Sequence, residues 1–168
     1  PQSELALVRK LSKKMKETDR VYLGNSLPIR EWDLGARRDV CFSNCFGNRG
    51  ANGIDGQLST FFGWADANER NWGIVGDLTA LYDLSSPWAL KHRALGHFGL
   101  IVINNGGGKI FQPIFQQPLF ENQHQTSFKN WAAMWSLGYR QWDGAELEKG
   151  ITEVIPDDAQ TKALRSAL

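Results

Sequence analysis

Two short runs of apolar residues, each leading to an oxygen-bearing side chain, constrain the fold of this chain more than any other feature. The first run, Trp72 to Val75, leads to Asp77, and the second, Phe98 to Ile103, leads to Asn105. Runs of this length, bounded by glycine or polar residues, are typical of buried strands. The amphipathic stretch between them, Leu78 to His92, has the length of a crossover helix. The three segments therefore predict a right-handed βαβ unit with parallel strands.

Strand and helix patterns alternate along the whole chain. We expect strands over 21–24, 39–43, 72–76, 98–104, 139–142 and 151–155, and helices over 4–17, 27–36, 53–65, 78–92, near 109–115, 126–137, 145–149 and 157–167. This alternation predicts an α/β fold with a doubly wound, mainly parallel sheet and helices on both faces, formed by residues 1–168 as a single domain. The polar, aperiodic stretch from Gln112 to Gln125 is predicted to be a loop over the ligand end of the sheet.

Length and charge limit the functions open to such a domain. With 168 residues, the chain can bury a core without disulfides or a structural metal. Its 19 basic and 18 acidic residues nearly balance, so bulk charge does not point to nucleic acid as a partner. No apolar run is long enough to span a bilayer and no signal-peptide pattern is present, so we expect a cytoplasmic protein with no membrane partner. Cys41 and Cys45 lack further metal-ligand types nearby and are interpreted as reduced thiols.

Asp77 and Asn105 are expected to meet, because parallel strands end at one edge of a sheet and ligands of open α/β folds bind there. A backbone carbonyl of the turn Gly106 to Gly108 would lie beside them. One carboxylate, one amide oxygen and one carbonyl leave an octahedron around Mg²⁺ incomplete, as expected where phosphate oxygens complete it. Each half alone also fits a helix-capping aspartate or an Asn-Gly turn. Together, the two halves predict a diphosphate held by a divalent cation.

Two further strand ends place candidate binding groups at the same edge. Ser26 and Arg30 follow the first expected strand, one helical turn apart. A guanidinium there suits a substrate carboxylate, although Arg30 alone also fits a solvent-exposed helix position. The segment NRGANGIDG, residues 48–56, is rich in glycine, which indicates close approach of its backbone to a ligand or to another chain. The histidines, His124 among them, are not spaced with another ligand type and are interpreted as surface or internally satisfied residues.

The strand-end motifs resemble one family. A Gly-Asp pair, followed at a distance by two asparagines and glycine, is similar to the motif with which thiamine enzymes bind thiamine diphosphate. In order, GNSLPIREWD, NRGANGIDGQLST, GDLTALYDL and NNGGGKIF resemble the C-terminal domain of the 2-succinyl-5-enolpyruvyl-6-hydroxy-3-cyclohexene-1-carboxylate (SEPHCHC) synthases of menaquinone biosynthesis. The resemblance is clear from about Tyr22 to Phe111 and weaker beyond. Leu78 replaces the glycine of the wider thiamine family, as the resemblance to these synthases predicts.

The resemblance implies the diphosphate-binding half of a thiamine site. Mg²⁺, or Mn²⁺ in its place, would be held by Asp77, the Asn105 side chain and the Gly107 carbonyl, and Ile54 would support the bent form of thiamine diphosphate. The cofactor-binding residues that it implies are Asn52, Gly53, Ile54, Gly76, Asp77, Leu78, Thr79, Asn105, Gly107 and Ile110. The substrate-binding residues that it implies are Ser26, Arg30, Arg49, Ile110, Phe111 and Ile114.

The reaction implied by the resemblance decarboxylates 2-oxoglutarate and adds the resulting succinyl unit to isochorismate. The cofactor supplies the chemistry, and the protein orients it. Thiamine enzymes carry their catalytic glutamate on an N-terminal domain, usually that of the partner subunit, and no motif of this chain matches it. We therefore interpret the chain as the C-terminal segment of a longer three-domain enzyme, a homodimer or homotetramer, and expect the segment alone to be inactive.

Three alternatives stay open from the sequence. One is the C-terminal domain of another thiamine enzyme, of the acetolactate synthase or 2-oxoacid decarboxylase type, whose less anionic substrates have less need of Arg30 and Arg49. Another is a non-catalytic oligomerisation module, in which tryptophans such as Trp32 and Trp131 contact a partner. A dinucleotide-binding domain is the third, but no GxGxxG motif follows the first expected strand.

Overall fold

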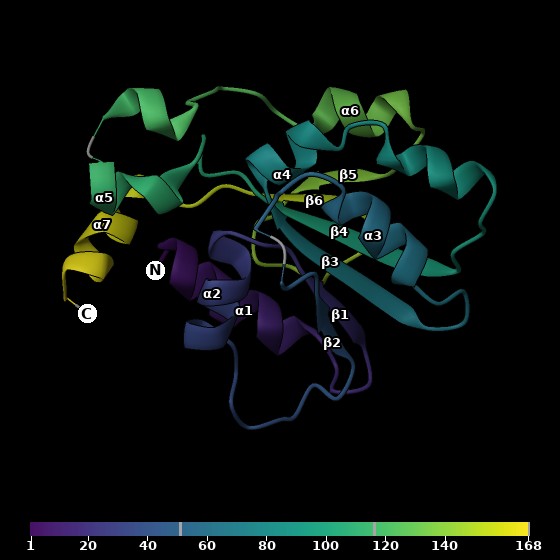
Figure 1. Cartoon of the computed structure of the whole chain (residues 1–168). Helices are drawn as coiled ribbons and strands as arrows, with labels where there is room; N and C mark the ends of the chain where they lie inside the picture. The colour runs from purple at the N-terminus through teal and green to yellow at the C-terminus, as the bar shows by residue number, and fades with distance from the viewer. Residues whose placement is uncertain (51, 116, 168) are drawn as a thin grey trace.

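A six-stranded sheet forms the centre of the computed structural model, which describes residues 1–50, 52–115 and 117–167. All strand pairings within the described residues are parallel, and the strand order is β2-β1-β3-β4-β6-β5 (Figure 1). The strands are β1 (Arg20–Leu23), β2 (Cys45–Gly47), β3 (Arg70–Gly76), β4 (His97–Ile103), β5 (Tyr139–Gln141) and β6 (Gly150–Val154). The expected doubly wound, parallel α/β fold is thereby confirmed.

Helices cover both faces of this sheet (Figure 1). The α-helices are α1 (Glu4–Lys14), α2 (Leu27–Gly35), α3 (Gln57–Trp64), α4 (Asp77–Tyr82), α5 (Gln112–Phe115), α6 (Lys129–Met134) and α7 (Asp158–Ala167). The 3-10 helices are η1 (Ser86–Lys91), η2 (Lys109–Phe111) and η3 (Pro118–Glu121). Among the described residues, no helix combines the length and the apolar character that crossing a bilayer requires.

Side chains of the central strands divide between two hydrophobic cores. In β4, Leu100 and Val102 pack with residues of α3 and α6, whereas Ile101 and Ile103 pack with residues of α1 and α2. Successive residues of a strand point to opposite faces, so a strand that is apolar at nearly every position needs helices on both sides. The continuous apolar runs of the sequence are explained by this burial.

Two tryptophans that were considered for contact with a partner belong to these cores instead. Trp32 of α2 packs in the core beneath α1, and Trp131 of α6 packs in the opposite core. Both side chains are buried. The oligomerisation alternative therefore receives no support from Trp32 or Trp131.

The strand expected over 39–43 is wrong, because the edge strand forms later, as β2. Val21 of β1 is paired with Cys45, the first residue of β2. The ring of Phe46 stacks on Trp64 with centroids 5.5 Å apart, whereas the ring of Phe42 packs against Trp32 at 5.2 Å. These two aromatic contacts hold the edge strand in its later register and leave residues 39–43 in a loop.

The single helix expected over 78–92 is also wrong. The helix α4 ends at Tyr82, and η1 begins at Ser86. Pro87 lies in the first turn of η1, and it has no N–H to donate to the carbonyl four residues earlier, so α4 cannot continue through it as an α-helix. Asp83 turns out of the helix instead, and its carboxylate accepts the backbone N–H and the hydroxyl of Ser59 at 2.8 and 3.0 Å.

Four other expected helices differ in extent or do not form. Those expected over 4–17, 53–65 and 126–137 are shorter, as α1, α3 and α6. Residues 145–149 form no helix, because Leu147 inserts into the core beside α1 and the preceding Asp143 accepts the Ala145 N–H in a turn. The stretch 112–125, expected to be a loop, contains the short helices α5 and η3. Ala51 of the motif at 48–56 and Gln116 of this loop lie outside the described residues.

Candidate functional site

A cavity of about 750 Å³ opens at the edge of the sheet where β1, β3 and β4 end. Its walls come from the residues that follow these strands, from the loop before α3 and from η2. The lining residues are Glu4, Asn25, Ser26, Leu27, Pro28, Arg30, Arg49, Asn52, Gly53, Ile54, Asp55, Gly76, Asp77, Leu78, Thr79, Tyr82, Asn105, Gly107, Gly108, Lys109, Ile110, Phe111 and Asn122. The cavity thus occupies the position at which open α/β sheets bind ligands.

All but one of the site residues predicted from the sequence line this cavity. From the ends of β1, β3 and β4 and the adjoining loops, it contains Ser26, Arg30, Arg49, Asn52, Gly53, Ile54, Gly76, Asp77, Leu78, Thr79, Asn105, Gly107, Ile110 and Phe111. The exception is Ile114, which lies in α5, is 69% exposed and is not part of the cavity wall. The prediction that Ile114 walls the cavity is therefore wrong for the described structure.

Asp77 is held by the main chain of the glycine turn after β4. Its Oδ2 accepts the N–H groups of Gly106 and Gly107 at 2.8 and 2.9 Å, and its Oδ1 accepts the N–H of Leu78 at 2.6 Å. The turn approaches in this way because Gly106 and Gly107 have φ values of 82° and 144°, which L side chains rarely adopt. Asp77 is 2% exposed. Burial raises the pKa of this carboxyl, although the hydrogen bond from Leu78 and the nearby His124 act in the opposite direction.

Asn105 offers an oxygen that no described residue binds. Its Nδ2 donates to both carboxylate oxygens of Glu4, at 3.1 and 3.2 Å. Its Oδ1 is buried and accepts no hydrogen bond within the described part of the chain. Leaving such an acceptor unsatisfied costs about 1–3 kcal/mol. A cation that is bound in the cavity would remove this cost, so the donor set fits a hard metal ion.

The described residues do not form a metal cage by themselves. No group of three or more His, Cys, Asp or Glu side chains among them is arranged to hold a metal ion. Asp77 and Asn105 provide one carboxylate and one neutral oxygen to the cavity. A cation at this edge would therefore take further oxygens from another ligand, as Mg²⁺ commonly does from phosphates.

His124 lies at the site, although the sequence suggested a surface or internally satisfied role. Its Nε2 is 3.2 Å from Asp77 Oδ2, and its backbone N–H donates to the Gly106 carbonyl at 3.1 Å. The loop that carries it packs tightly on the glycine turn, where a Cβ on Gly107 would collide with the carbonyl of Glu121. No spacing in the sequence signals this contact, because it depends on how the loop folds back.

A hydrogen-bonded network fixes the opposite wall of the cavity. Arg49 Nη1 donates to Asn25 Oδ1 at 3.2 Å, and Asn25 Nδ2 donates to the Gly53 carbonyl at 2.7 Å. Gln57 Oε1 accepts the Asn25 backbone N–H at 3.2 Å. These bonds tie the loop that carries Ile54 to the end of β1. Asn25 was not among the residues predicted for the site, although its position directly after a strand, like that of Asn105, was a usable signal.

Ser26 and Arg30 lie together, as their spacing predicted. Ser26 has φ 77° and ψ −133°, a strained conformation for a residue other than glycine, and its carbonyl accepts a hydrogen bond from Arg30 Nη1 at 2.8 Å. Backbone strain of this kind is concentrated at binding sites. Arg30 and Arg49 are both exposed at the cavity, so their remaining N–H groups are available to an anion.

Comparison with solved structures places the fold in a known class. The chain superposes on the X-ray structure of a Mycobacterium smegmatis protein described as a thiamin diphosphate-dependent enzyme, with a TM-score of 0.69 and 14% sequence identity over 93% of this chain and 32% of that one. No protein-family model matches the chain. The chain thus has the fold of a domain from the thiamine diphosphate-dependent enzymes.

The similar sequences are more specific. The chain is 53% identical over 160 residues to the 2-succinyl-5-enolpyruvyl-6-hydroxy-3-cyclohexene-1-carboxylate synthase of Bdellovibrio bacteriovorus. The matched region covers 92% of this chain and 30% of that protein. It is 40% identical over 186 residues to the synthase of the same name from Akkermansia muciniphila, covering 100% of this chain and 35% of that protein. The chain spans about a third of the length of these curated relatives. Its resemblance to the SEPHCHC synthases is therefore confirmed.

Proposed function

We propose that this chain is the thiamine diphosphate-binding domain of a SEPHCHC synthase and that its cavity holds the diphosphate through a divalent cation. One observation carries the proposal: a buried carboxylate, Asp77, and a buried amide oxygen without a donor, Asn105 Oδ1, line the same cavity at the ends of neighbouring strands. The identity of 53% to a synthase of that name supports the choice of family. Mg²⁺ suits these oxygen ligands, and Mn²⁺ is its usual substitute.

The side chains around the cavity have complementary roles in this proposal. Asp77, Asn105 Oδ1 and the Gly107 carbonyl would hold the cation. The Gly107 carbonyl accepts the Lys109 N–H at 2.9 Å, which leaves its second lone pair for a metal. When bound, thiamine diphosphate supplies an electron sink for the loss of CO₂ from a 2-oxo acid. Ile54 lies at the cavity wall on a loop held by the hydrogen bond between Asn25 and Gly53, and its side chain would support the bent form of the cofactor.

The remaining cofactor contacts would come from residues next to these. Gly76, Leu78 and Thr79 follow the end of β3, and Asn52 and Gly53 precede Ile54 on its loop. Ile110 lies on η2 and also lines the cavity. These residues would orient the cofactor, which is the contribution expected of a protein in a cofactor-dependent reaction.

The two arginines favour anionic substrates, which we propose to be 2-oxoglutarate and isochorismate. Arg30 and Arg49 reach the cavity from different segments, so each can bind a separate carboxylate. Ser26 adds a hydroxyl beside Arg30, and Ile110 and Phe111 add an apolar wall. Substrates of acetolactate synthases and simple 2-oxoacid decarboxylases have fewer carboxylates, and two cavity arginines make that alternative less suitable.

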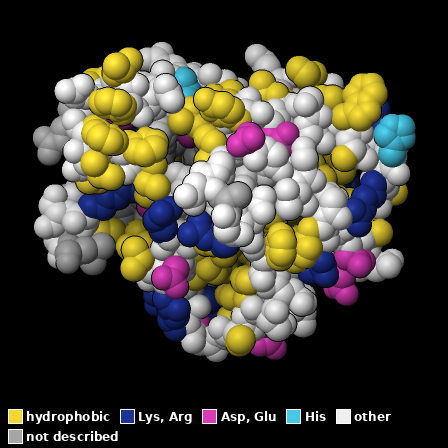
Figure 2. All heavy atoms as spheres, in the orientation of Figure 1, with side chains coloured by type: hydrophobic (Ala, Val, Ile, Leu, Met, Phe, Trp, Pro, Cys, Tyr) yellow, Lys and Arg dark blue, Asp and Glu magenta, His cyan; other side chains and the backbone are white. Residues whose placement is uncertain are grey.

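We infer that further parts complete the active site. The relatives match this chain over 30% and 35% of their length, which supports a three-domain protein in which the catalytic glutamate lies elsewhere. A group of exposed apolar residues beside the cavity supports coverage by another domain or by a second subunit of a homodimer or homotetramer. The group consists of Phe111, Ile114, Phe115, Leu119 and Phe120, and apolar side chains gather over α5 at the upper left of Figure 2.

Calorimetry with thiamine diphosphate and Mg²⁺ tests the cofactor site. The experiment uses the protein as the organism makes it and compares the wild type with Asp77→Ala. We expect the wild type to bind and the variant to bind at least about tenfold more weakly, because losing a charged ligand costs more than about 1.4 kcal/mol. The absence of binding by the wild type, or equal binding by the variant, would contradict the proposal.

A further inference from the structure

We propose that Glu4 is a positioning residue that determines which atom of Asn105 faces a cation in the cavity. The inference rests on the proposed function, because it concerns the same cation. Glu4 begins α1, is 1% exposed and lines the cavity. Both of its carboxylate oxygens accept hydrogen bonds from Asn105 Nδ2, across 101 positions of the sequence. The first helix of the chain is thereby connected directly to a candidate metal ligand.

Glu4 selects one of two nearly isosteric orientations of the Asn105 amide. Asn105 Nδ2 lies 3.1 and 3.2 Å from the two carboxylate oxygens of Glu4, and two oxygens that accept hydrogen bonds require the NH₂ end of the amide to face them. Oδ1 then faces the opposite way, where it is buried without a donor. The reverse orientation would bring two acceptors together at Glu4 and would present an NH₂ group to the cation. Only the orientation that Glu4 imposes provides a metal ligand.

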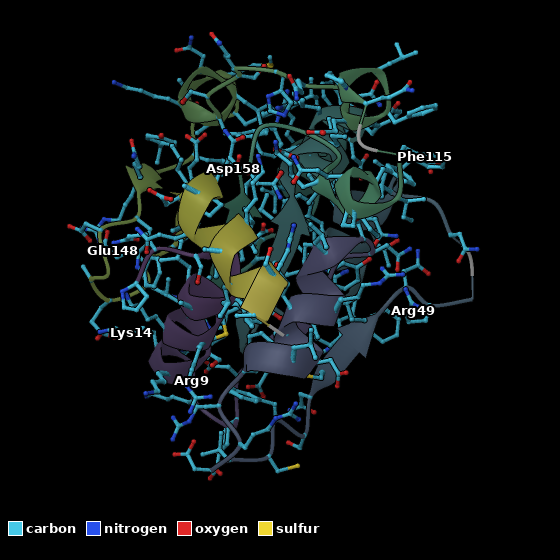
Figure 3. The ribbon with its side chains drawn as sticks, turned by 90° about the vertical axis from the view of Figure 1, so that its left-hand side faces the viewer. Arg9, Lys14, Arg49, Phe115, Glu148 and Asp158 are labelled. Carbon is cyan, nitrogen blue, oxygen red and sulfur yellow. The ribbon has the colours of Figure 1, made fainter. Side chains whose placement is uncertain are left out.

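The helix α7 holds Glu4 in this position. Arg165 Nη2 lies 3.5 Å from Glu4 Oε2 and 3.1 Å from Glu31 Oε1, and the Glu4 backbone N–H donates to Thr161 Oγ1 at 3.0 Å. Figure 3 shows α7 lying across α1 and α2, whereas the labelled Arg49 lies to one side of these helices. Arg165 therefore contacts both buried acidic side chains and connects α7 to α1 and α2.

Glu31 provides a matched control for Glu4. Both acidic side chains are buried, both contact Arg165, and they are hydrogen-bonded to each other. Glu31 does not line the cavity, however, and makes no hydrogen bond to Asn105 in the described structure. Replacing either residue with methionine removes one buried carboxylate and leaves a side chain of similar length. Only the Glu4 variant removes the acceptor that orients Asn105.

The test measures Mn²⁺ affinity by electron paramagnetic resonance in the presence of thiamine diphosphate, with the protein as the organism makes it. Residues that orient a metal ligand typically change metal affinity by about 10–100-fold, so we expect Glu4→Met to weaken Mn²⁺ binding by that factor. Glu31→Met should weaken Mn²⁺ binding much less than Glu4→Met, because both oxygens of Glu4 stay in place to accept from Asn105 Nδ2. Glu4→Gln should recover most of the loss, because its carbonyl oxygen can still accept from Asn105 Nδ2.

The outcomes separate this inference from the proposed function. Wild-type protein that binds no Mn²⁺ with thiamine diphosphate would overturn both. Two results would overturn the role of Glu4 alone while the wild type still binds Mn²⁺. One is equal Mn²⁺ affinity of Glu4→Met and wild type, and the other is an equal loss of affinity in Glu31→Met and Glu4→Met. A crystal structure of the wild type with Mn²⁺ and thiamine diphosphate does not depend on any variant folding. We expect Asn105 Oδ1 on the metal and Nδ2 on Glu4, and any other partner for Nδ2 would overturn the inference.

Discussion

The carboxylate of Asp77 accepts the backbone N–H of Gly107 at 2.9 Å, although 30 positions separate the two residues. This bond joins the end of β3 to the turn after β4. It is a charge-assisted hydrogen bond in a buried environment, so it orders the glycine turn as well as the carboxylate. The same contact places Asn105 and the Gly107 carbonyl on the wall that Asp77 shares.

Gly107→Ala should damage this turn. The φ of 144° strains any L side chain, and a Cβ would collide with the Glu121 carbonyl, so we expect a loss of about 1–3 kcal/mol in the free energy of unfolding. Urea denaturation measures the change. Gly63→Ala is the control, because Gly63 lies in α3 and a Cβ added there would meet open space. This variant should have the stability of the wild type or be more stable by up to about 1 kcal/mol. Equal midpoints for wild type and Gly107→Ala would show that the turn tolerates a side chain.

Both residues that join the strand ends could be predicted from the sequence. Asp77 and Asn105 each follow an apolar run of strand length, and the helix-length segment between those runs implied parallel strands ending at one edge. The break at Pro87 was also visible in the sequence, since proline excludes an uninterrupted helix there. The prediction of one helix over 78–92 used only the amphipathic pattern of that stretch.

Other parts of the site depend on packing that local pattern does not encode. Glu4 reaches Asn105 across 101 positions, and His124 reaches Asp77 through a loop that folds back on the glycine turn. The register of β2 follows from where Phe42 and Phe46 find ring partners, Trp32 and Trp64, in the tertiary structure. Such contacts are set by the completed fold and were missed for that reason.

Arg30→Ala should reduce succinyl transfer. A hydrogen bond to a charged group contributes about 1.5–3 kcal/mol, so the loss of one carboxylate partner predicts a decrease of about 10–100-fold in kcat/KM. Steady-state kinetics with varied 2-oxoglutarate and isochorismate provide the measurement. Arg38→Ala is the control, because Arg38 does not line the cavity and bonds the Asp33 carbonyl on the surface. Unchanged kinetics for Arg30→Ala would remove Arg30 from the substrate site.

Glu31 should make stability depend on pH. Burial, with the neighbouring Glu4 carboxylate, raises the pKa of Glu31 from 4.5 to about 8, against the opposing hydrogen bond from Arg165. Between these pH values the folded state holds a proton that the unfolded state has released, so the free energy of unfolding falls as pH rises from about 4.5 to about 8. Urea midpoints measured across that range should fall less steeply for Glu31→Gln. Parallel curves for the two proteins would contradict a raised pKa at Glu31.

Product formation tests the central claim most directly. The protein as the organism makes it is supplied with thiamine diphosphate, Mg²⁺, 2-oxoglutarate and isochorismate, and SEPHCHC and CO₂ are quantified by mass spectrometry. We predict one CO₂ for each SEPHCHC formed, no product when thiamine diphosphate is omitted, and no turnover by residues 1–168 alone. Cofactor binding without any SEPHCHC would contradict the assignment to this synthase, and product formed by the isolated chain would contradict the need for further domains.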